Sequence, residues 1–353
     1  MNMLLNMTTE TGNWLSGELD SVGLVLENQL KNKHDAVNEV CEHLSGYRGK
    51  MLRPSLVLLS WRSVQNQIDV PSDVHRAAGV VELIHLATLV HDDVLDEADI
   101  RRGGQTINSL WGNEGAVMLG DYLLSSAFHL CSMIRNPSLN VLLGEVTNTL
   151  CAGELVQLYH RNDVKLGLSE YYQIIHDKTA SLVSAACKIG GILGNADDDT
   201  VGNLGIFGES IGTAFQIRDD LIDILSDVRS AGKPTGRDVA KGKMTLPAIL
   251  MLKNDPSCLQ RLQKALDGDD LPCIKNMLIE SSSIAGAEKI ICNLLMMRLF
   301  RLVLYKKICV ENCWFGLPGN FLNRFNYNLC FLFGIHCRQR SVHLKVEGLV
   351  FRF

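Results

Sequence analysis

Several marks of other protein classes are missing from this sequence of 353 residues. The formal net charge is −5, so there is no general excess of the basic residues that nucleic-acid binding needs. No uninterrupted apolar run reaches about 18 residues, so we predict no membrane-spanning helix. Residues 1–15 lack the basic and apolar segments of a secretory signal. We therefore expect a cytoplasmic protein with no nucleic-acid partner and at most peripheral membrane contact.

Paired cysteines and strand-like runs are also scarce. The 11 cysteines are scattered without a regular spacing, so we expect reduced thiols that mostly lie in the core. Runs of β-branched residues bounded by turn residues are missing, which argues against a β-sheet. Apolar residues instead recur at three- and four-residue steps in segments 15–44, 74–94, 116–133, 141–160, 169–193 and 201–225. The sequence therefore predicts an all-α fold.

The composition changes abruptly near Met297. Residues 298–353 hold nine of the 34 Lys and Arg residues, only two of the 39 Asp and Glu residues, and half of the aromatic residues. A helical pattern is hard to follow beyond Lys307. We therefore predict two units, a helical domain at residues 1–297 and a divergent basic, aromatic and cysteine-rich tail at residues 298–353.

Two clusters of aspartates carry the chemistry. They consist of Asp92, Asp93 and Asp96, and of Asp219, Asp220 and Asp223. Within each cluster the first and third aspartates are four residues apart, so they lie about 6 Å apart on one face of a helix. Such carboxylates repel one another without a cation, and hard oxygen ligands suit Mg²⁺, which also binds phosphates. A single Asp-Asp pair could be a solvated helix end. Two clusters that each follow an apolar helix instead predict acids around a shared wet cavity.

Basic residues near the ends of the predicted helices complete the pattern. Lys50 and Arg53 are three residues apart and could grip one polyanion together. Further donors are Arg101, Arg102, Lys178, Lys233 and Lys243. Arginine forks match the oxygens of a diphosphate, whereas lysines act as point charges. One such pair is most often a surface charge. Together with two acidic clusters, the set predicts a protein that handles two diphosphates, one through metal and one directly.

The segments that contain these residues resemble the signature motifs of the trans-isoprenyl diphosphate synthases. Residues 82–103 resemble the first aspartate-rich motif of that family, and residues 212–223 resemble the second. Segments 49–54 and 232–247 are similar to two further family signatures, in the expected order, and the resemblance covers about residues 15–295. It implies a helical bundle with a deep central cavity, which catalyses the Mg²⁺-dependent transfer of an allylic prenyl group to isopentenyl diphosphate.

The resemblance also implies a role for each matched residue. The six aspartates would hold two or three Mg²⁺ ions against the allylic diphosphate. The residues that match contacts with this diphosphate are Arg101, Lys178 and Lys243. Those that match the isopentenyl diphosphate site are Lys50, Arg53, His85 and Arg102. Thr179, Gln216 and Gln157 match positions that line the reacting centre, so that the expected catalytic residues are Lys178, Thr179, Gln216 and Lys243. Lys233, a further substrate-binding candidate, and Asp238 belong to a matched motif.

The helix that leads into Asp92 predicts the length of the product. Thr88 and Ala87 lie four and five residues before Asp92, about one turn deeper along the helix. In the family, a bulky aromatic residue at these positions blocks the growing chain, and here both residues are small. The first cluster also lacks the two-residue insertion of bacterial farnesyl diphosphate synthases. The resemblance is therefore to synthases of long all-trans polyprenyl chains for quinones, although small residues could also reflect tight helix packing.

Two other functions stay open at this point. A terpene cyclase would share the fold and the first motif, but its second metal site uses Asn, Ser or Thr, and Glu in place of three aspartates. A non-catalytic or impaired subunit of a hetero-oligomeric synthase would be expected to lose aspartates or the pair of Lys50 and Arg53, and here all are present. For either form of synthase we expect a homodimer, or a heteromer with a related subunit.

The tail departs from the family pattern of amphipathic helices rich in Ala, Glu and Leu. Four cysteines and a histidine could form a zinc site, although their spacing is irregular: Cys309, Cys313, Cys330, His336 and Cys337. A basic aromatic tail could also touch a membrane surface. We favour a frame change or a misjoined exon, in which case helices that normally close the bundle would be missing.

Overall fold

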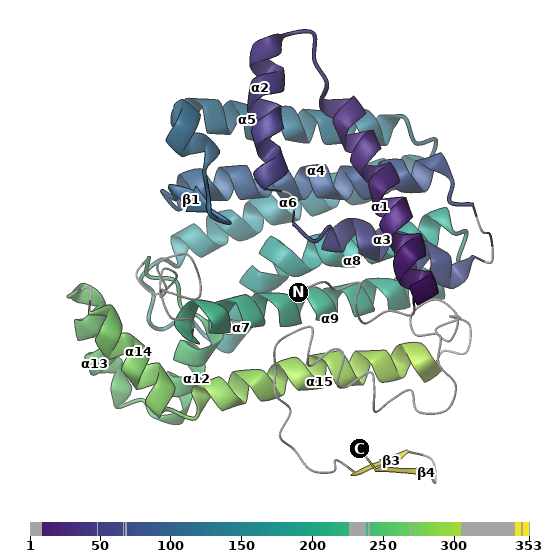
Figure 1. The fold of residues 1–353 in the computed structure, drawn as a ribbon. Coiled ribbons are helices and arrows are strands. Elements are labelled where there is room, and N and C mark those ends of the chain that lie inside the picture. Colours follow the sequence, from purple (N-terminus) through teal and green to yellow (C-terminus); the bar gives the residue numbers. More distant parts are fainter. Residues whose placement is uncertain are drawn as a thin grey trace.

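The structure is a computed structural model, and its described part confirms the predicted all-α class (Figure 1). It describes residues 9–47, 49–65, 67, 69–225, 238, 241–268, 270–304, 343–346 and 349–352. The first half contains α1 (Thr9–Leu30), α2 (Asp35–His43), the 3-10 turn η2 (Leu44–Gly46), α3 (Leu52–Val64), α4 (Ser72–Leu95), β1 (Ile100–Arg101), β2 (Gly104–Gln105), α5 (Ile107–Ser132) and α6 (Pro137–Tyr159). The second half contains α7 (Leu168–Ile175), the π-helical turn η3 (His176–Ala180), α8 (Ser181–Leu193), α9 (Asp198–Leu225), α12 (Leu246–Asn254), α13 (Cys258–Asp267), α14 (Leu271–Glu280), α15 (Ser283–Leu304), β3 (His343–Val346) and β4 (Leu349–Arg352).

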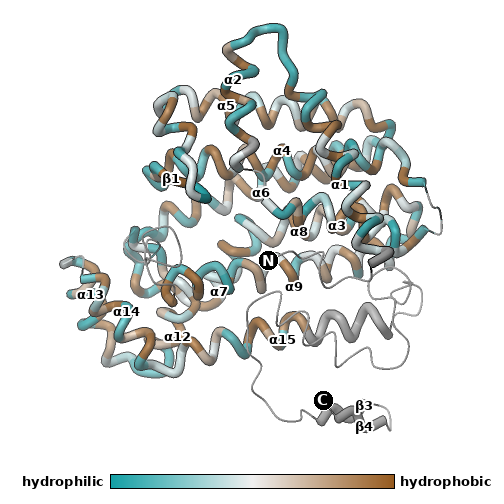
Figure 2. The backbone as a smooth tube through the Cα atoms, viewed as in Figure 1, coloured by the Kyte–Doolittle hydropathy of each residue, from teal (hydrophilic) through white to brown (hydrophobic). Residues whose placement is uncertain are grey.

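The long helices pack side by side in a stack that runs from α5 through α4, α3, α8 and α9 to α15, with α1 crossing one face (Figure 1). Hydrophobic residues recur along α4, α8 and α9, whereas the connection between α1 and α2 is hydrophilic (Figure 2). One core lies among α1, α3, α4, α5, α6 and α8, and a second lies among α7, α9 and α12 to α15. The site described below is built from elements of both cores.

The predicted helices occur with shifted ends. Segment 15–44 is divided between α1 and α2, because Asn32 and Asn38 close a turn between them. The main-chain N–H of Asn32 donates to Asn38 Oδ1 at 2.9 Å, and Asn38 Nδ2 donates to the Asn32 carbonyl at 2.9 Å. Asparagine side chains compete in this way with helical hydrogen bonds. In α5, Gly112 has a φ of 75°, which interrupts the helix before the periodic segment that begins at residue 116.

The segment predicted as one helix from 169 to 193 contains the π-helical turn η3 between α7 and α8. Gly153 of α6 permits η3 to approach closely, because a Cβ atom there would lie 2.6 Å from the Asp177 Cβ atom and 2.9 Å from the Lys178 nitrogen. π-helical turns occur frequently at functional sites. This one carries Lys178 and Thr179.

Short strands occur where the sequence predicted no β-structure. β1 pairs antiparallel with β2 through a turn in which Arg102 and Gly103 both have positive φ angles. β3 pairs antiparallel with β4 within the tail segment. α15 runs across the predicted unit boundary at residue 297 and ends at Leu304. The boundary itself stays a prediction, and the residues of the suggested zinc site lie outside the described part of the chain.

The described residues bear on two expectations, one about membrane-spanning helices and one about the cysteines. Among these residues, no helix combines the length and the apolar character needed to cross a membrane. The cysteines described are all free thiols, at positions 41, 131, 151, 187, 258, 273 and 292, and two of them are fully buried.

Candidate functional site

The first aspartate cluster lies at the C-terminal end of α4. In the buried stretch 77–90, only His85, Thr88 and Leu89 are partly exposed. Residues three, four and seven apart share one face of a helix, so these side chains form a stripe that continues to Asp92. This accessible stripe of α4 ends at Asp96, which directly follows the helix.

The two residues expected to control product length lie differently on α4. Thr88 belongs to the accessible stripe, and its hydroxyl donates to the His85 carbonyl at 2.8 Å. Ala87 is fully buried, with 0% exposure, and is part of the hydrophobic core. Of the two, only Thr88 therefore faces the same side as Asp92 in this structure.

Asp96 is paired with two lysines that lie far away in the sequence. Its Oδ1 atom is 3.0 Å from Lys241 Nζ and 3.1 Å from Lys243 Nζ. Burial alone would raise the pKa of Asp96, but the two ammonium groups outweigh this effect and lower the pKa. Lys243 Nζ also lies 3.5 Å from Asp238 Oδ1. The end of α4 thus meets Lys241 and Lys243 at the site.

Asp92 faces the cation of Lys178, which η3 supplies. Lys178 Nζ lies 4.0 Å from Asp92 Oδ2 and 2.6 Å from Glu154 Oε2, and it donates to Gln157 Oε1 at 2.9 Å. Desolvation would lower the pKa of Lys178, but the carboxylates of Asp92 and Glu154 raise it on balance. Burial raises the pKa of Asp92, which Lys178 only partly offsets. α6 therefore holds a permanent cation beside the first cluster.

The middle aspartate of the first cluster is bound within the protein. Asp93 is 2% exposed, and Arg101 donates to both of its carboxylate oxygens at 2.8 to 3.0 Å. Tyr47 Oη also donates to Asp93 Oδ2 at 2.8 Å. A buried carboxylate needs such donors to offset its lost hydration. The structure thus pairs Asp93 and Arg101 with each other, whereas the resemblance implied that they reach a metal ion and a diphosphate.

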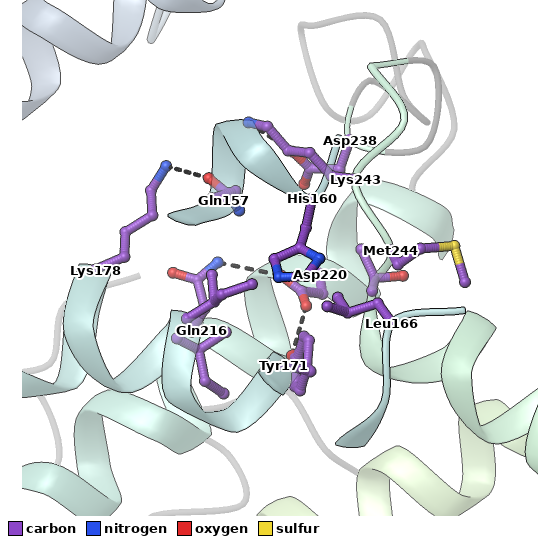
Figure 3. A pocket seen from close by; sticks show the side chains of 13 residues that line it. Gln157, His160, Leu166, Tyr171, Lys178, Gln216, Asp220, Asp238, Lys243 and Met244 are labelled. Atoms are coloured by element: carbon purple, nitrogen blue, oxygen red, sulfur yellow. Dashed lines mark hydrogen bonds and ion pairs between the residues drawn. The ribbon is translucent and has the colours of Figure 1, made fainter. Parts of the chain in front are cut away.

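The second cluster lies in the last turns of α9, and its middle aspartate is also buried. Asp220 is 5% exposed and accepts from Tyr171 Oη at 2.7 Å and from Gln216 Nε2 at 3.1 Å (Figure 3). Thr179 Oγ1 donates to Gln216 Oε1 at 2.7 Å. A continuous chain of hydrogen bonds therefore links η3 to the second cluster and then to α7.

The carboxylates of the second cluster are poorly neutralised. Burial raises the pKa of Asp220 to about 7, and the nearby charge of Asp238 adds to this effect. Asp219 reaches solvent, but crowding by protein atoms desolvates it and raises its pKa to about 6. The main-chain N–H of Asp238 donates to Asp223 Oδ2 at 3.1 Å. Oxygen donors with an excess of negative charge fit a hard divalent cation such as Mg²⁺.

The way in which a metal would be held follows from the spacing of these groups. Among the described residues, no three Asp, Glu, His or Cys side chains converge closely enough to form a complete metal centre. Mg²⁺ commonly keeps waters and takes one or two carboxylates together with substrate phosphates. The residues present fit that mode, in which each cluster supplies part of the ligands.

A second group of basic residues lies beside the stripe of α4. Desolvation lowers the pKa of His85, and the charges of Arg53 and Arg102 lower it further, so these three side chains are near neighbours. The buried Nε atom of Arg53 has no hydrogen-bond partner among the described residues. Arg102 Nη1 donates to the Tyr47 carbonyl at 2.6 Å, and Lys50 is exposed in the loop before α3. An unpaired guanidinium N–H suits an anionic ligand.

A pocket connects the polar elements around the second cluster (Figure 3). Its charged and amide-bearing walls are formed by Gln157, Lys178, Gln216, Asp220, Asp238 and Lys243. Leu166, Ile174, Ile175 and Met244 contribute apolar walls, together with His160, Tyr171 and Thr245. Five predicted site residues from four separate segments therefore share one pocket, namely Gln157, Lys178, Gln216, Asp220 and Lys243. Lys233 lies outside the described residues.

Sequence reasoning missed four residues that shape the site. Lys241 lies within a matched segment, two residues before Lys243, and its charge and position could have identified it. Glu154 is one turn from Gln157 on α6 and becomes visible only through its ion pair with Lys178. Tyr47 and Tyr171 lie in no spacing pattern with the aspartates, because their contacts span 46 and 49 residues of sequence.

Fold and site together define an all-helical protein in which two aspartate clusters and a set of cations meet in one polar region. The sequence model of the polyprenyl synthetase family matches residues 34–277, and this chain belongs to that family. The predicted family membership is therefore confirmed, as is the prediction of a prenyltransferase enzyme.

Individual relatives agree with this assignment. The chain is 34% identical over 241 residues to heptaprenyl diphosphate synthase component 2 of Bacillus subtilis, covering 68% of either chain. It is 35% identical over 244 residues to nonaprenyl diphosphate synthase of Mycobacterium tuberculosis, covering 69% of this chain and 72% of that one. Among solved structures, heptaprenyl diphosphate synthase from Staphylococcus aureus matches with a TM-score of 0.79 at 28% identity, over 91% of this chain and 96% of that chain.

Proposed function

We propose that this chain condenses isopentenyl diphosphate with an allylic diphosphate, in an Mg²⁺-dependent reaction, to form a long all-trans polyprenyl diphosphate for a quinone side chain. The observation that supports the proposal most is that the same lysines lie close to both aspartate clusters. Asp92 of α4 and Asp96, which directly follows α4, lie beside Lys178 and Lys243, and both lysines line the pocket that also contains Asp220 of the second cluster. Relatives named as nonaprenyl and octaprenyl diphosphate synthases support a long product.

The allylic diphosphate would bind between the two clusters. Asp92 and Asp96 from α4, and Asp219 and Asp223 from α9, would hold the metal ions. Mg²⁺ would neutralise the charge that develops on the departing diphosphate. Lys178 adds a fixed positive charge there, because Glu154 and Gln157 already hold its ammonium group in place.

The isopentenyl diphosphate would bind to the separate basic group of Arg53, His85, Arg102 and Lys50. Desolvation keeps His85 neutral, so it can donate a hydrogen bond without adding charge. The proton lost after condensation would pass to the departing diphosphate, so no protein base is required. Apolar side chains such as Leu89 would keep water from the allylic cation.

The product chain would grow along the accessible stripe of α4. Thr88 lies on this stripe about one turn below Asp92, and its small side chain leaves room for a chain to pass. Ala87 is buried behind the stripe, and its small side chain would not push the neighbouring side chains toward the path of the product. Small residues at both positions are consistent with a long product.

A second copy of the chain would dock on the exposed apolar surface of α5 and α6, which we call the α5–α6 face. Its residues, with exposures of 40% to 85%, are Val117, Met118, Phe128, Val141, Leu155 and Tyr159. The two helices contact each other, and exposed apolar surface on neighbouring elements commonly marks a protein interface. A related subunit is the alternative partner for this face, because two relatives are named component 2 of a heptaprenyl diphosphate synthase.

A labelled-substrate assay tests the proposed reaction. The full-length protein is incubated with radiolabelled isopentenyl diphosphate, farnesyl diphosphate and Mg²⁺, and the extracted polyprenyl products are separated by length. We expect long labelled diphosphates that vanish with excess chelator. Turnover in excess chelator would contradict the metal-binding role of the clusters. A labelled hydrocarbon would indicate a cyclase, and no incorporation would favour the non-catalytic or impaired subunit.

A further inference from the structure

The middle aspartate of each cluster is held by a tyrosine that lies outside the aspartate motifs. Tyr47 Oη donates to Asp93 Oδ2 at 2.8 Å, and Tyr171 Oη donates to Asp220 Oδ2 at 2.7 Å. All four side chains are buried, with exposures between 2% and 5%. The same arrangement therefore occurs in both clusters, although α4 and α9 receive their tyrosines from unrelated segments.

Tyr47 connects three elements around the end of α4. Its hydroxyl donates to Asp93 and accepts from the main-chain N–H of Ile107, the first residue of α5, at 3.0 Å. The hydroxyl thus uses both its donor and its acceptor capacity. The ring centre lies 5.7 Å from the guanidinium carbon of Arg101, and the Tyr47 carbonyl accepts from Arg102 at 2.6 Å. Tyr47 therefore joins α4, the β1–β2 turn and α5.

Tyr171 plays the corresponding part for α9. Its hydroxyl supplies one of the two hydrogen bonds that Asp220 receives, and Gln216 supplies the other. Because Gln216 is itself held by Thr179 of η3, the carboxylate of Asp220 is fixed from two sides (Figure 3).

Fixing a middle aspartate also fixes its outer neighbours. Successive side chains on an α-helix point about 100° apart, so the rotation of the last turn sets all three directions at once. With Asp93 turned into the protein, Asp92 and Asp96 remain on the accessible side of α4. With Asp220 turned inwards, Asp219 and Asp223 reach solvent on α9.

We propose that Tyr47 and Tyr171 are positioning residues, which orient the metal-binding aspartates of the two clusters by holding Asp93 and Asp220. The inference rests on the proposed function, because it takes the outer aspartates as the ligands of Mg²⁺. Groups that orient the ligands of a metal typically change its affinity about 10- to 100-fold when they are removed.

The test measures metal binding without turnover. Mn²⁺ is titrated into the full-length protein with inorganic diphosphate, and free Mn²⁺ is followed by electron paramagnetic resonance. Tyr47→Phe and Tyr171→Phe keep the ring and remove only the hydroxyl. We expect each to raise the Kd of Mn²⁺ by about 10-fold and to raise the Mg²⁺ concentration needed for activity. Melting temperatures are measured alongside.

Tyr122→Phe is the matched control. The Tyr122 hydroxyl is also hydrogen-bonded, at 3.3 Å each to the Leu30 carbonyl and to Asn32 Nδ2, and these partners belong to neither aspartate cluster. We expect this variant to bind Mn²⁺ as the parent does. In an Asp93→Asn background, Tyr47→Phe should have little further effect on Mn²⁺ affinity, because contacting residues are not additive.

Several results would overturn the inference. Mn²⁺ affinities of Tyr47→Phe and Tyr171→Phe equal to that of Tyr122→Phe would do so. So would a melting temperature or a yield of folded protein that falls far below the control, since the tyrosines would then act on the stability of the bundle. If Tyr47→Phe weakened Mn²⁺ binding equally in the parent and in the Asp93→Asn background, Tyr47 would not act through Asp93. Failure of the proposed function can be distinguished from failure of this inference, because the unsubstituted protein would then show no prenyl transfer.

Discussion

Single residues of this site are arranged so that charge is in place before any ligand arrives. Lys178 lies beside Asp92 and is held by Glu154 and Gln157, so little side-chain freedom remains to be lost on binding. Arg53 instead keeps a buried N–H without a partner among the described residues. The first arrangement suits stabilisation of a leaving group, and the second suits capture of an anion.

Replacing Lys178 tests the first arrangement. Lys178→Gln should lower kcat by about 100-fold, because removal of one preorganised donor to a developing charge typically costs about 10²- to 10³-fold. Lys165→Gln, at an exposed lysine, should leave kcat unchanged. Steady-state kinetics with saturating substrates measure both variants, and equal rates for the two would show that Lys178 does not act on the leaving group.

Replacing Arg53 tests the separation of the two diphosphate sites. Arg53→Ala should raise the KM for isopentenyl diphosphate more than the KM for the allylic primer, because Arg53 is a neighbour of His85 in the second basic group, although its charge also reaches Asp219. The exposed Arg135 provides the control substitution Arg135→Ala. A similar increase in both KM values would mean that the two sites have been assigned wrongly.

The sequence could predict residues whose role follows from spacing. Asp92 and Asp96, or Asp219 and Asp223, lie four residues apart, and the spacing that places such residues on one side of a helix is a local rule. The partners of Asp93 and Asp220 could not be predicted, since Tyr47 and Tyr171 approach through tertiary packing. The pairing of Arg101 with Asp93 also depends on tertiary packing, and the predicted contact of Arg101 with a diphosphate stays a prediction.

At the level of elements, α4 and η3 set the geometry of the site. α4 was predictable because its long apolar run and polar C-terminal end match a buried helix, and the observed ends differ by only one or two residues. η3 was not predictable, because a π-helical turn leaves the apolar periodicity of segment 169–193 nearly unchanged. Packing against Gly153 on α6 instead accounts for its close approach.

Substitutions on α4 test the path of the growing chain. Thr88→Phe should shorten the product by several isoprene units while the first condensation continues, because the ring would fill the accessible stripe below Asp92. Ala87→Phe should also shorten the product by pushing on the same wall. Its burial means that overpacking would cost about 1–3 kcal/mol of stability.

Product chromatography and melting temperatures of both variants provide the check. Leu24→Phe, on the exposed surface of α1, is the control and should change neither quantity. Products of unchanged length from a folded Thr88→Phe enzyme would show that the chain does not grow along this face of α4.

The whole molecule combines two cores with a tail of different character. α15 packs on α9 and α12 and so belongs to the second core, whereas β3 and β4 pair with each other. The composition change near residue 297 predicts a boundary there, but it could not show that α15 continues to Leu304. A helix held by its first turns can extend into a segment of altered composition.

Truncation after Leu304 tests the independence of the tail. The shortened protein should keep its melting temperature and its prenyl transfer, because the excess of basic and aromatic residues sets the tail apart from the bundle. Circular dichroism and the labelled-substrate assay measure the two properties. A truncated protein that becomes insoluble would show that the tail covers apolar surface of the bundle.

Charges placed on the α5–α6 face test its role as a subunit interface. Leu155→Glu should convert a dimer into monomers, because a carboxylate would be buried without a partner on association. Leu24→Glu places the same charge on a similarly exposed leucine of α1 and should leave the dimer intact. Sedimentation velocity distinguishes these states. A parent protein that is monomeric alone and assembles only with a related subunit would assign the face to a heteromer.

The ion pairs of Asp96 with Lys241 and Lys243 have a consequence for how metal and diphosphate would bind. While Lys241 and Lys243 hold this carboxylate, they compete with a divalent cation for its oxygens. An incoming diphosphate would attract the same ammonium groups and so leave Asp96 available to a metal ion. Metal and diphosphate should therefore bind synergistically, each strengthening the other by the same factor, as thermodynamic linkage requires. In this way the resting enzyme would discriminate against free cations and respond to the metal–diphosphate complex.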